Sequence, residues 1–242
     1  MLGMLIIIII AGGIYCRFGG FGTGKSADTA EFAKYAGQVS DITIPEETRI
    51  IALGEATHGN AEFQQLKLEV FQIMVENYGV RSYALEADYG CCETANRYIH
   101  GGEGTAAQAA SALGFQIYQT DEMANLLSWM RAYNENVSEG EDLRIYGFDM
   151  QRYDADYEYF IEMAGALGAD TAKLKKIWNN GTFNEAYTRE QRVEIIKGVK
   201  EALLQNEKPV NEQAVHFADI LLQNIELGSL INIGKQGYLR FV

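Results

Sequence analysis

A strand–helix–strand pattern between residues 49 and 88 constrains the fold of this chain more than any other feature. Arg49–Gly54 is short, apolar and rich in β-branched residues, as buried strands are, and Val80–Leu85 has the same character. Between them, residues 60–77 carry apolar side chains at helical spacing, and Gly79 marks the expected helix end. Strands joined by one helix through short loops run parallel. The sequence therefore predicts an α/β fold.

A third apolar run and a helical C-terminal region complete the predicted architecture. Leu143–Phe148 is predicted to be another strand. We expect a mostly parallel sheet flanked by helices over residues 41–151, followed by a mainly helical region, 152–242, that forms a lid or a subdomain. In that region helical spacing is found in Tyr153–Gly168, Asp170–Trp178, Arg189–Asn206 and Asn211–Leu227.

Acidic side chains follow each of the three predicted strands. Glu55 and His58 follow the first strand, Glu86 the second and Asp149 the third. Because open α/β sheets bind their ligands at the carboxyl ends of the strands, we expect these side chains to lie together there. Lys67 falls within the apolar arc of the intervening helix, where a lysine needs a route to water or an anionic partner. It can therefore point to the same pocket.

These residue types favour general acid–base chemistry. A histidine between carboxylates can be held in one tautomer and act as a general base for water, while a lysine supplies positive charge to an oxyanion or orients a carboxylate. We expect catalytic roles for His58, Glu55 and Glu86, and substrate-binding roles for Lys67 and Asp149. The alternative is a set of polar loop residues, with the histidine capping a helix or lying on the surface.

Other chemistries lack their sequence signatures. The chain has no GxSxG motif, which disfavours acyl transfer through a serine nucleophile. Zinc could bind through His58 and the acids, but no HExxH motif or second nearby histidine supports it, and we predict neither a metal nor a cofactor. His100 and His216 have no partner spacing and are predicted to be structural. A net charge of −13 without a basic cluster excludes nucleic acid as a partner. No disulfide framework is expected from the three cysteines, Cys16, Cys91 and Cys92.

The N-terminal residues are unusually apolar. Met1–Cys16 carries no charge and contains five consecutive isoleucines. As a helix it would rise about 24 Å, somewhat less than the roughly 30 Å hydrocarbon core. We expect residues 1–18 to be a membrane anchor or signal-like segment, which makes the protein membrane-anchored or exported. A buried strand is the alternative and would leave the protein cytoplasmic. Residues 19–40 are expected to form a glycine-rich linker and a short helix.

Residues 19–26 match the G-x4-G-K-S phosphate loop. In such a loop backbone N–H groups wrap phosphates, while Lys25 would reach the β/γ oxygens and Ser26 would hold Mg²⁺. A flexible glycine-rich linker explains the same residues. Nucleotide binding through Gly19–Ser26 therefore remains an alternative function. A non-catalytic, membrane-tethered binding module is a second alternative.

Seven segments carry a distinctive set of residues, namely Leu53–Gly59, Phe63, Ala84–Glu86, Gly102–Ala106, Gln119–Glu122, Leu127–Asn134 and Tyr146–Gln151. Together with Lys67 they resemble the erythromycin esterase-like family. The resemblance implies metal-independent hydrolysis of a small-molecule ester or lactone, with macrolide lactones, and hence antibiotic resistance, for the best-known members. It gives the water-activating role to His58 and the supporting roles to Glu55 and Glu86, while Lys67 stands where members carry arginine or lysine.

The resemblance also implies a longer chain. Family members have a further strand and a second active-site histidine in the half that would follow Val242. We therefore expect a truncated product or a fragment, with esterase activity reduced or lost. If the remaining sheet stood alone, we would expect it to expose an unpaired apolar edge, which favours aggregation.

Overall fold

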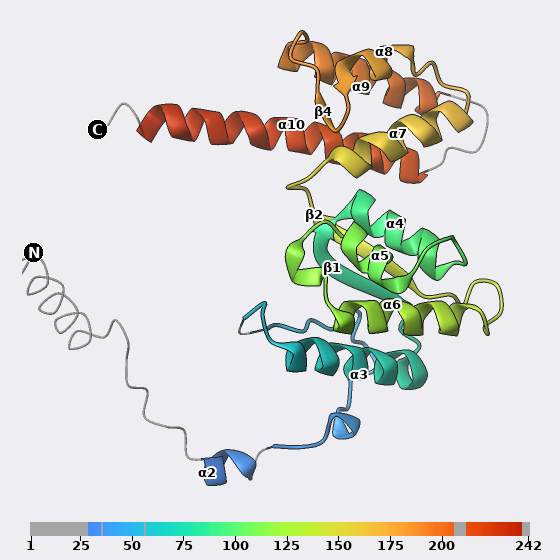
Figure 1. Ribbon diagram of the computed structural model, residues 1–242, viewed down its shortest axis with the longest axis vertical. Coiled ribbons are helices and arrows are strands. Elements are labelled where there is room, and N and C mark those ends of the chain that lie inside the picture. The colour runs from blue at the N-terminus through green and yellow to red at the C-terminus, as the bar shows by residue number, and fades with distance from the viewer. Residues whose placement is uncertain (1–28, 35, 56, 206–211, 239–242) are drawn as a thin grey trace, which may run out of the picture. The chain divides into compact units, whose positions relative to one another are not determined.

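The computed structural model describes residues 29–34, 36–55, 57–205 and 212–238 (Figure 1). The chain divides into two compact units, Met1–Thr48 and Arg49–Val242. The described part of the first unit forms α2 (Thr29–Ala33) and the 3₁₀ helix η1 (Val39–Asp41). The second unit contains α3 (Ala61–Tyr78), β1 (Ser82–Asp88), α4 (Tyr89–Ile99), α5 (Ala106–Ala112), η2 (Gln116–Tyr118), α6 (Asp121–Asn134), β2 (Arg144–Asp149), α7 (Asp154–Ala166), α8 (Ala172–Ile177), β3 (Trp178–Asn179), β4 (Thr182–Phe183), α9 (Arg189–Leu204) and α10 (Glu212–Tyr238).

Two features of the sequence lie outside the described residues. These are the apolar segment 1–18 and the phosphate-loop match Gly19–Ser26. Of the helices in the described ranges, none is both long enough and apolar enough to cross a membrane.

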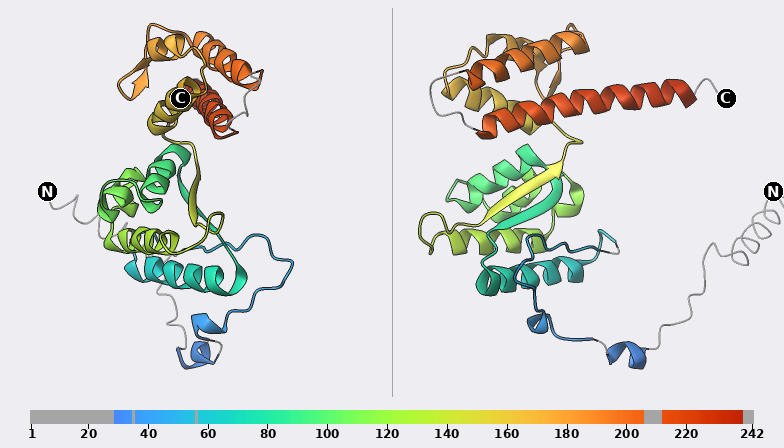
Figure 2. Two further views of the ribbon diagram at one scale, coloured as in Figure 1. Left: turned by 90° about the vertical axis from the view of Figure 1, so that its right-hand side faces the viewer. Right: turned by 180° about the vertical axis from the view of Figure 1, so that it is seen from behind.

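The sheet is smaller than predicted. β1 and β2 pair in parallel, as expected for the second and third apolar runs (Figure 2). The prediction of a first strand at Arg49–Gly54 is wrong, because these residues are coil and the side chain of Ile50 is 84% exposed. A β-strand forms where a neighbouring strand hydrogen-bonds to its backbone N–H and C=O groups and where other elements bury its side chains. A β-branched composition alone provides neither. β3 and β4 form a separate antiparallel hairpin.

β1 contains a bulge close to its carboxyl end. Leu85 pairs with Gly147, but the next pair is Asp88 with Asp149, so two residues of β1 face one residue of β2. Gly147 lies against this bulge, where a Cβ would be 2.2 Å from the carbonyl oxygen of Ala87. The bulge breaks the in–out alternation of the strand. As a result Asp88 is buried, while the residue two positions earlier is exposed.

Two asparagine side chains occupy the outer edge of β2. Asn134 of α6 exchanges hydrogen bonds of 2.7 and 3.0 Å with the backbone N–H and C=O of Leu143. Asn96 of α4 does the same for Ile145, at 2.9 and 2.7 Å. These two backbone positions face away from β1, because the intervening Arg144 donates its N–H to the β1 side. The backbone groups of Leu143 and Ile145 on this edge therefore have hydrogen-bond partners.

The second unit has two hydrophobic cores. One lies between the sheet and helices α3 to α6, and includes Leu127 and Ile145 at 0% exposure. The other is formed by the helices from α7 to α10 and the β3–β4 hairpin, and includes Tyr157 and Phe217. The predicted helix 60–77 is confirmed as α3, and Gly79 ends it in the left-handed conformation.

Buried aspartates join the sheet part to the helical region. The Oδ1 atom of Asp88 accepts a hydrogen bond from the backbone N–H of Arg152 at 2.6 Å. The Oδ1 atom of Asp156, in the first turn of α7, accepts from the N–H of Gly90 in α4 at 2.8 Å. The second oxygen of each carboxyl is buried and has no hydrogen-bond partner in the described part of the chain. Desolvation raises the pKa of Asp88 to about 6 and that of Asp156 to about 7.

Candidate functional site

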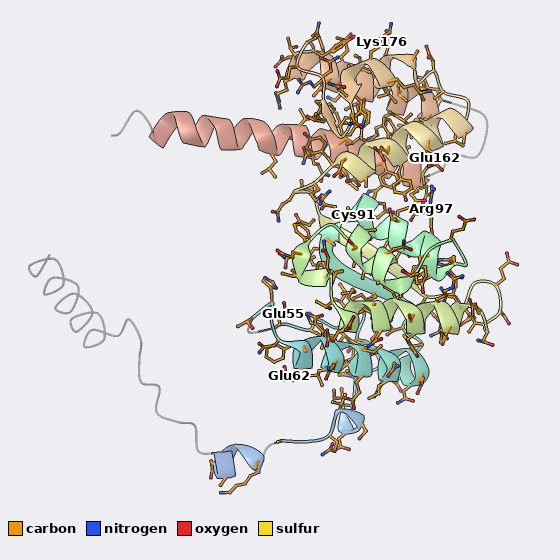
Figure 3. The ribbon with its side chains drawn as sticks, viewed as in Figure 1. Glu55, Glu62, Cys91, Arg97, Glu162 and Lys176 are labelled. Carbon is orange, nitrogen blue, oxygen red and sulfur yellow. The ribbon has the colours of Figure 1, made fainter. Side chains whose placement is uncertain are left out.

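Glu55 lies at the centre of the candidate site, in the loop before α3 (Figure 3). Its Oε1 atom is 2.5 Å from Nδ1 of His58. Its Oε2 atom accepts hydrogen bonds from Nζ of Lys67 at 2.5 Å and from Nε2 of Gln64 at 3.1 Å. The side chains of Glu55 and Lys67 are each 15% exposed, whereas that of His58 is 59% exposed. The carboxylate is therefore enclosed by donors, and the imidazole faces solvent.

The donors around Glu55 keep it ionised. The hydrogen bond from Lys67 lowers the pKa of Glu55 most, and the hydrogen bond from His58 adds to the effect against the opposing cost of burial. An ionised carboxylate only accepts hydrogen bonds, so Nδ1 of His58 carries the proton. Its Nε2 atom has no hydrogen-bond partner among the residues described, and in a neutral imidazole with the proton on Nδ1 this nitrogen carries the lone pair.

Helical spacing explains why Lys67 reaches Glu55. Gln64 and Lys67 are three residues apart, so they lie on one side of α3 close to its amino end. The sequence placed Lys67 within the apolar arc, where it needs water or an anion, and the structure supplies the anion. Gln64 was missed, although its i, i+3 relation to the lysine was a usable signal.

The structure does not bring Glu86 and Asp149 into this cluster. Glu86 is exposed, and its carboxylate makes no hydrogen bond or ion pair with any described residue. Asp149 accepts hydrogen bonds from the N–H of Met150 at 2.7 Å and from Nε2 of Gln151 at 2.6 Å. Three regular strand ends at one edge would bring these acids together. The first of these strands is absent, and the second carries the bulge.

Tyrosines next to the site were also missed by sequence reasoning. Tyr118 is buried and donates a hydrogen bond from its hydroxyl to the backbone C=O of Glu86 at 3.0 Å. Burial, and to a smaller extent the charge of Glu55, raises the pKa of Tyr83 to about 12. Tyr83 lies on β1, and its ring packs edge-on against Phe71 of α3, with 5.0 Å between the centroids. An isolated tyrosine in a sequence gives no signal for such a contact.

The other histidines occupy separate environments. His100 lies between the backbone C=O of Asn96, 2.7 Å from its Nδ1, and Oδ2 of Asp142, 3.0 Å from its Nε2. Asp142 precedes β2, so this pair lies at the opposite end of the strand from Asp149. His216 packs edge-on against Tyr89. Within the described ranges, no three His, Cys, Asp or Glu side chains are grouped so as to hold a metal ion.

An ionised carboxylate that contacts a histidine and is itself held by a lysine is an arrangement that general acid–base chemistry can use. The chain belongs to the erythromycin esterase family, whose model matches residues 75–227. Glu86 and Asp149 lie within the matched residues. Glu55, His58 and Lys67 precede them, so their roles depend on the geometry of the site and on the resemblance of the segment around them.

Named relatives agree with this membership. Erythromycin esterase type II of Escherichia coli is 29% identical over 46% of this chain and 26% of its own length. A Bacillus subtilis (strain 168) protein provisionally named hydrolase YbfO is 23% identical over 73% of this chain and 39% of its own. A solved Bacillus cereus protein is 25% identical with a TM-score of 0.59, over 72% of this chain and 46% of that one. The chain thus spans less than half the length of each of these proteins.

Proposed function

We propose that the protein is a hydrolase in which His58 acts as the general base that activates water. Nε2 of His58 takes a proton from a water molecule, whose oxygen attacks the carbonyl carbon of an ester. Glu55 stabilises the imidazolium that forms, through the hydrogen bond at Nδ1. The imidazolium then returns the proton to the departing alkoxide, so that ester and water become acid and alcohol.

The observation that carries this proposal is the enclosure of Glu55. A histidine makes an efficient base only if its tautomer and ring direction are fixed before the substrate binds. Here one oxygen of the carboxylate contacts the imidazole, while Lys67 and Gln64 hold the other. Since the Lys67 ammonium is engaged in this way, we assign it to orienting the carboxylate in the absence of substrate.

We assign Glu86 and Asp149 to the substrate side of the reaction. Neither contacts His58 within the described residues, so any direct role must involve water or substrate. A carboxylic ester or lactone is the substrate class that we propose, and a macrolide lactone is its specific form. The support is membership in the erythromycin esterase family and the relative named erythromycin esterase type II.

Hydrolysis of p-nitrophenyl butyrate and of erythromycin by the full chain tests this function. His58→Ala should abolish hydrolysis of whichever compound is a substrate and leave the melting temperature nearly unchanged, because the side chain is mostly exposed. His100→Ala is the matched control, since it removes another histidine that contacts a carboxylate, and hydrolysis should persist. Hydrolysis that survives His58→Ala would refute the proposal.

A further inference from the structure

We propose that Tyr118 is a positioning residue: its hydroxyl holds the Glu86 carbonyl at the β1 bulge and so fixes where the Glu86 carboxylate meets the substrate. This inference rests on the hydrolase function proposed above. It concerns a residue that does not touch the reacting atoms and that acts through the backbone of another residue.

Glu86 lies in the bulge and has no paired residue on β2. The last regular pair before it is Leu85 with Gly147, and the next is Asp88 with Asp149. Bulges re-aim side chains and interrupt strand pairing, so the backbone at the bulged residue needs another hydrogen-bond partner to stay in one orientation. The Tyr118 hydroxyl supplies that partner at 3.0 Å.

The bulge is also fixed from its other side. Gly147 of β2 packs so closely that there is no room for a Cβ beside the carbonyl oxygen of Ala87. The bulged segment is thus held between the backbone of β2 and the phenol of Tyr118. Two contacts on this short segment fix its backbone, and with it the direction of the Cα–Cβ bond from which the Glu86 side chain starts.

The surroundings of Tyr118 keep its hydroxyl in place as a hydrogen-bond donor to the Glu86 carbonyl. The residue ends η2 and is only 5% exposed, so its ring cannot swing into solvent. Burial raises the pKa of its hydroxyl, followed by the charges of Glu86 and Glu55, so the phenol stays protonated and donates. Both candidate acids therefore lie near enough to Tyr118 for their charges to affect it, although they do not contact each other.

The experiment combines Tyr118→Phe with Glu86→Gln and follows hydrolysis of p-nitrophenyl butyrate. Tyr118→Phe keeps the buried ring and removes the hydroxyl alone. We expect it to lower kcat about tenfold with little change in KM, because positional errors act on the transition state. Glu86→Gln should lower kcat at least as much. In the Glu86→Gln background, Tyr118→Phe should cause no further loss.

Tyr157→Phe is the matched control. Tyr157 is also buried and also donates to a backbone carbonyl at 3.0 Å, that of Leu174, but it belongs to the helical core. Tyr157→Phe should lower the free energy of unfolding about as much as Tyr118→Phe does, and its kcat should equal that of the unmodified chain. The inference is wrong if Tyr118→Phe behaves like this control, if Glu86→Gln leaves kcat unchanged, or if the losses from Tyr118→Phe and Glu86→Gln add. Full activity of His58→Ala would instead refute the hydrolase proposal.

Discussion

Replacing Asp156 with asparagine should remove much of a pH dependence of stability that is unusual in sign. Asp156 is fully buried, and desolvation raises its pKa from 3.8 to about 7. A carboxyl whose pKa is higher in the folded state than in the unfolded state stabilises the fold at low pH. That stability is lost as the pH rises through the folded-state pKa. The protein should therefore be less stable at pH 8 than at pH 5.

The magnitude follows from the size of the shift. One pKa unit corresponds to about 1.4 kcal/mol, so the shift of Asp156 corresponds to about 4 kcal/mol over its full range. About 3 kcal/mol of this falls between pH 5 and pH 8. Asp88, with a pKa of about 6, adds a smaller decrease in the same direction and interacts electrostatically with Asp156, so the two effects are not independent. Such a change is large beside a typical unfolding free energy of about 5–15 kcal/mol.

Urea denaturation followed by far-ultraviolet circular dichroism at several pH values measures this effect. In Asp156→Asn the amide oxygen can still accept the hydrogen bond from Gly90, but the group no longer titrates. The decrease in stability from pH 5 to pH 8 should therefore shrink to the part due to Asp88. Asp121→Asn, at an exposed position in α6, is the control and should keep the full decrease. An undiminished decrease in Asp156→Asn would refute the reasoning.

Three further changes test other contacts. Lys67→Met should lower kcat about 10- to 100-fold for ester hydrolysis with little loss of stability, because Glu55 loses its strongest donor; steady-state kinetics check this. Asn96→Leu should destabilise by about 2–4 kcal/mol in urea titrations, because the buried N–H and C=O of Ile145 lose their partners. Gly147→Ala should destabilise by about 3 kcal/mol or more, measured in the same way, because a Cβ there meets backbone.

The sequence was most informative where short-range pattern decides the structure. The helix 60–77, the two apolar runs that became β1 and β2, and the helical character of residues after 151 all follow from local spacing. That Arg49–Gly54 does not form a strand could not be predicted in the same way. Strand pairing depends on which segments lie beside these residues and not on their composition.

The site was predictable in part for the same reason. His58 follows Glu55 by three residues, and Lys67 comes from the helix that the same loop enters, so their proximity is nearly local. The position of Glu86 depends on a bulge, and therefore on the close approach of Gly147 and on Tyr118 from a distant part of the chain. One extra residue in a strand changes which face each later side chain takes, and hydrophobic alternation does not show it.

The asparagines on β2 have a consequence for how this protein meets other chains. An amide group that exchanges two hydrogen bonds with one residue imitates the next strand, and Asn134 and Asn96 do this at alternate positions, Leu143 and Ile145. A strand from another chain would have to displace both asparagine side chains before it could extend the sheet at Leu143 and Ile145. The two amides therefore hinder edge-to-edge association of sheets at Leu143 and Ile145.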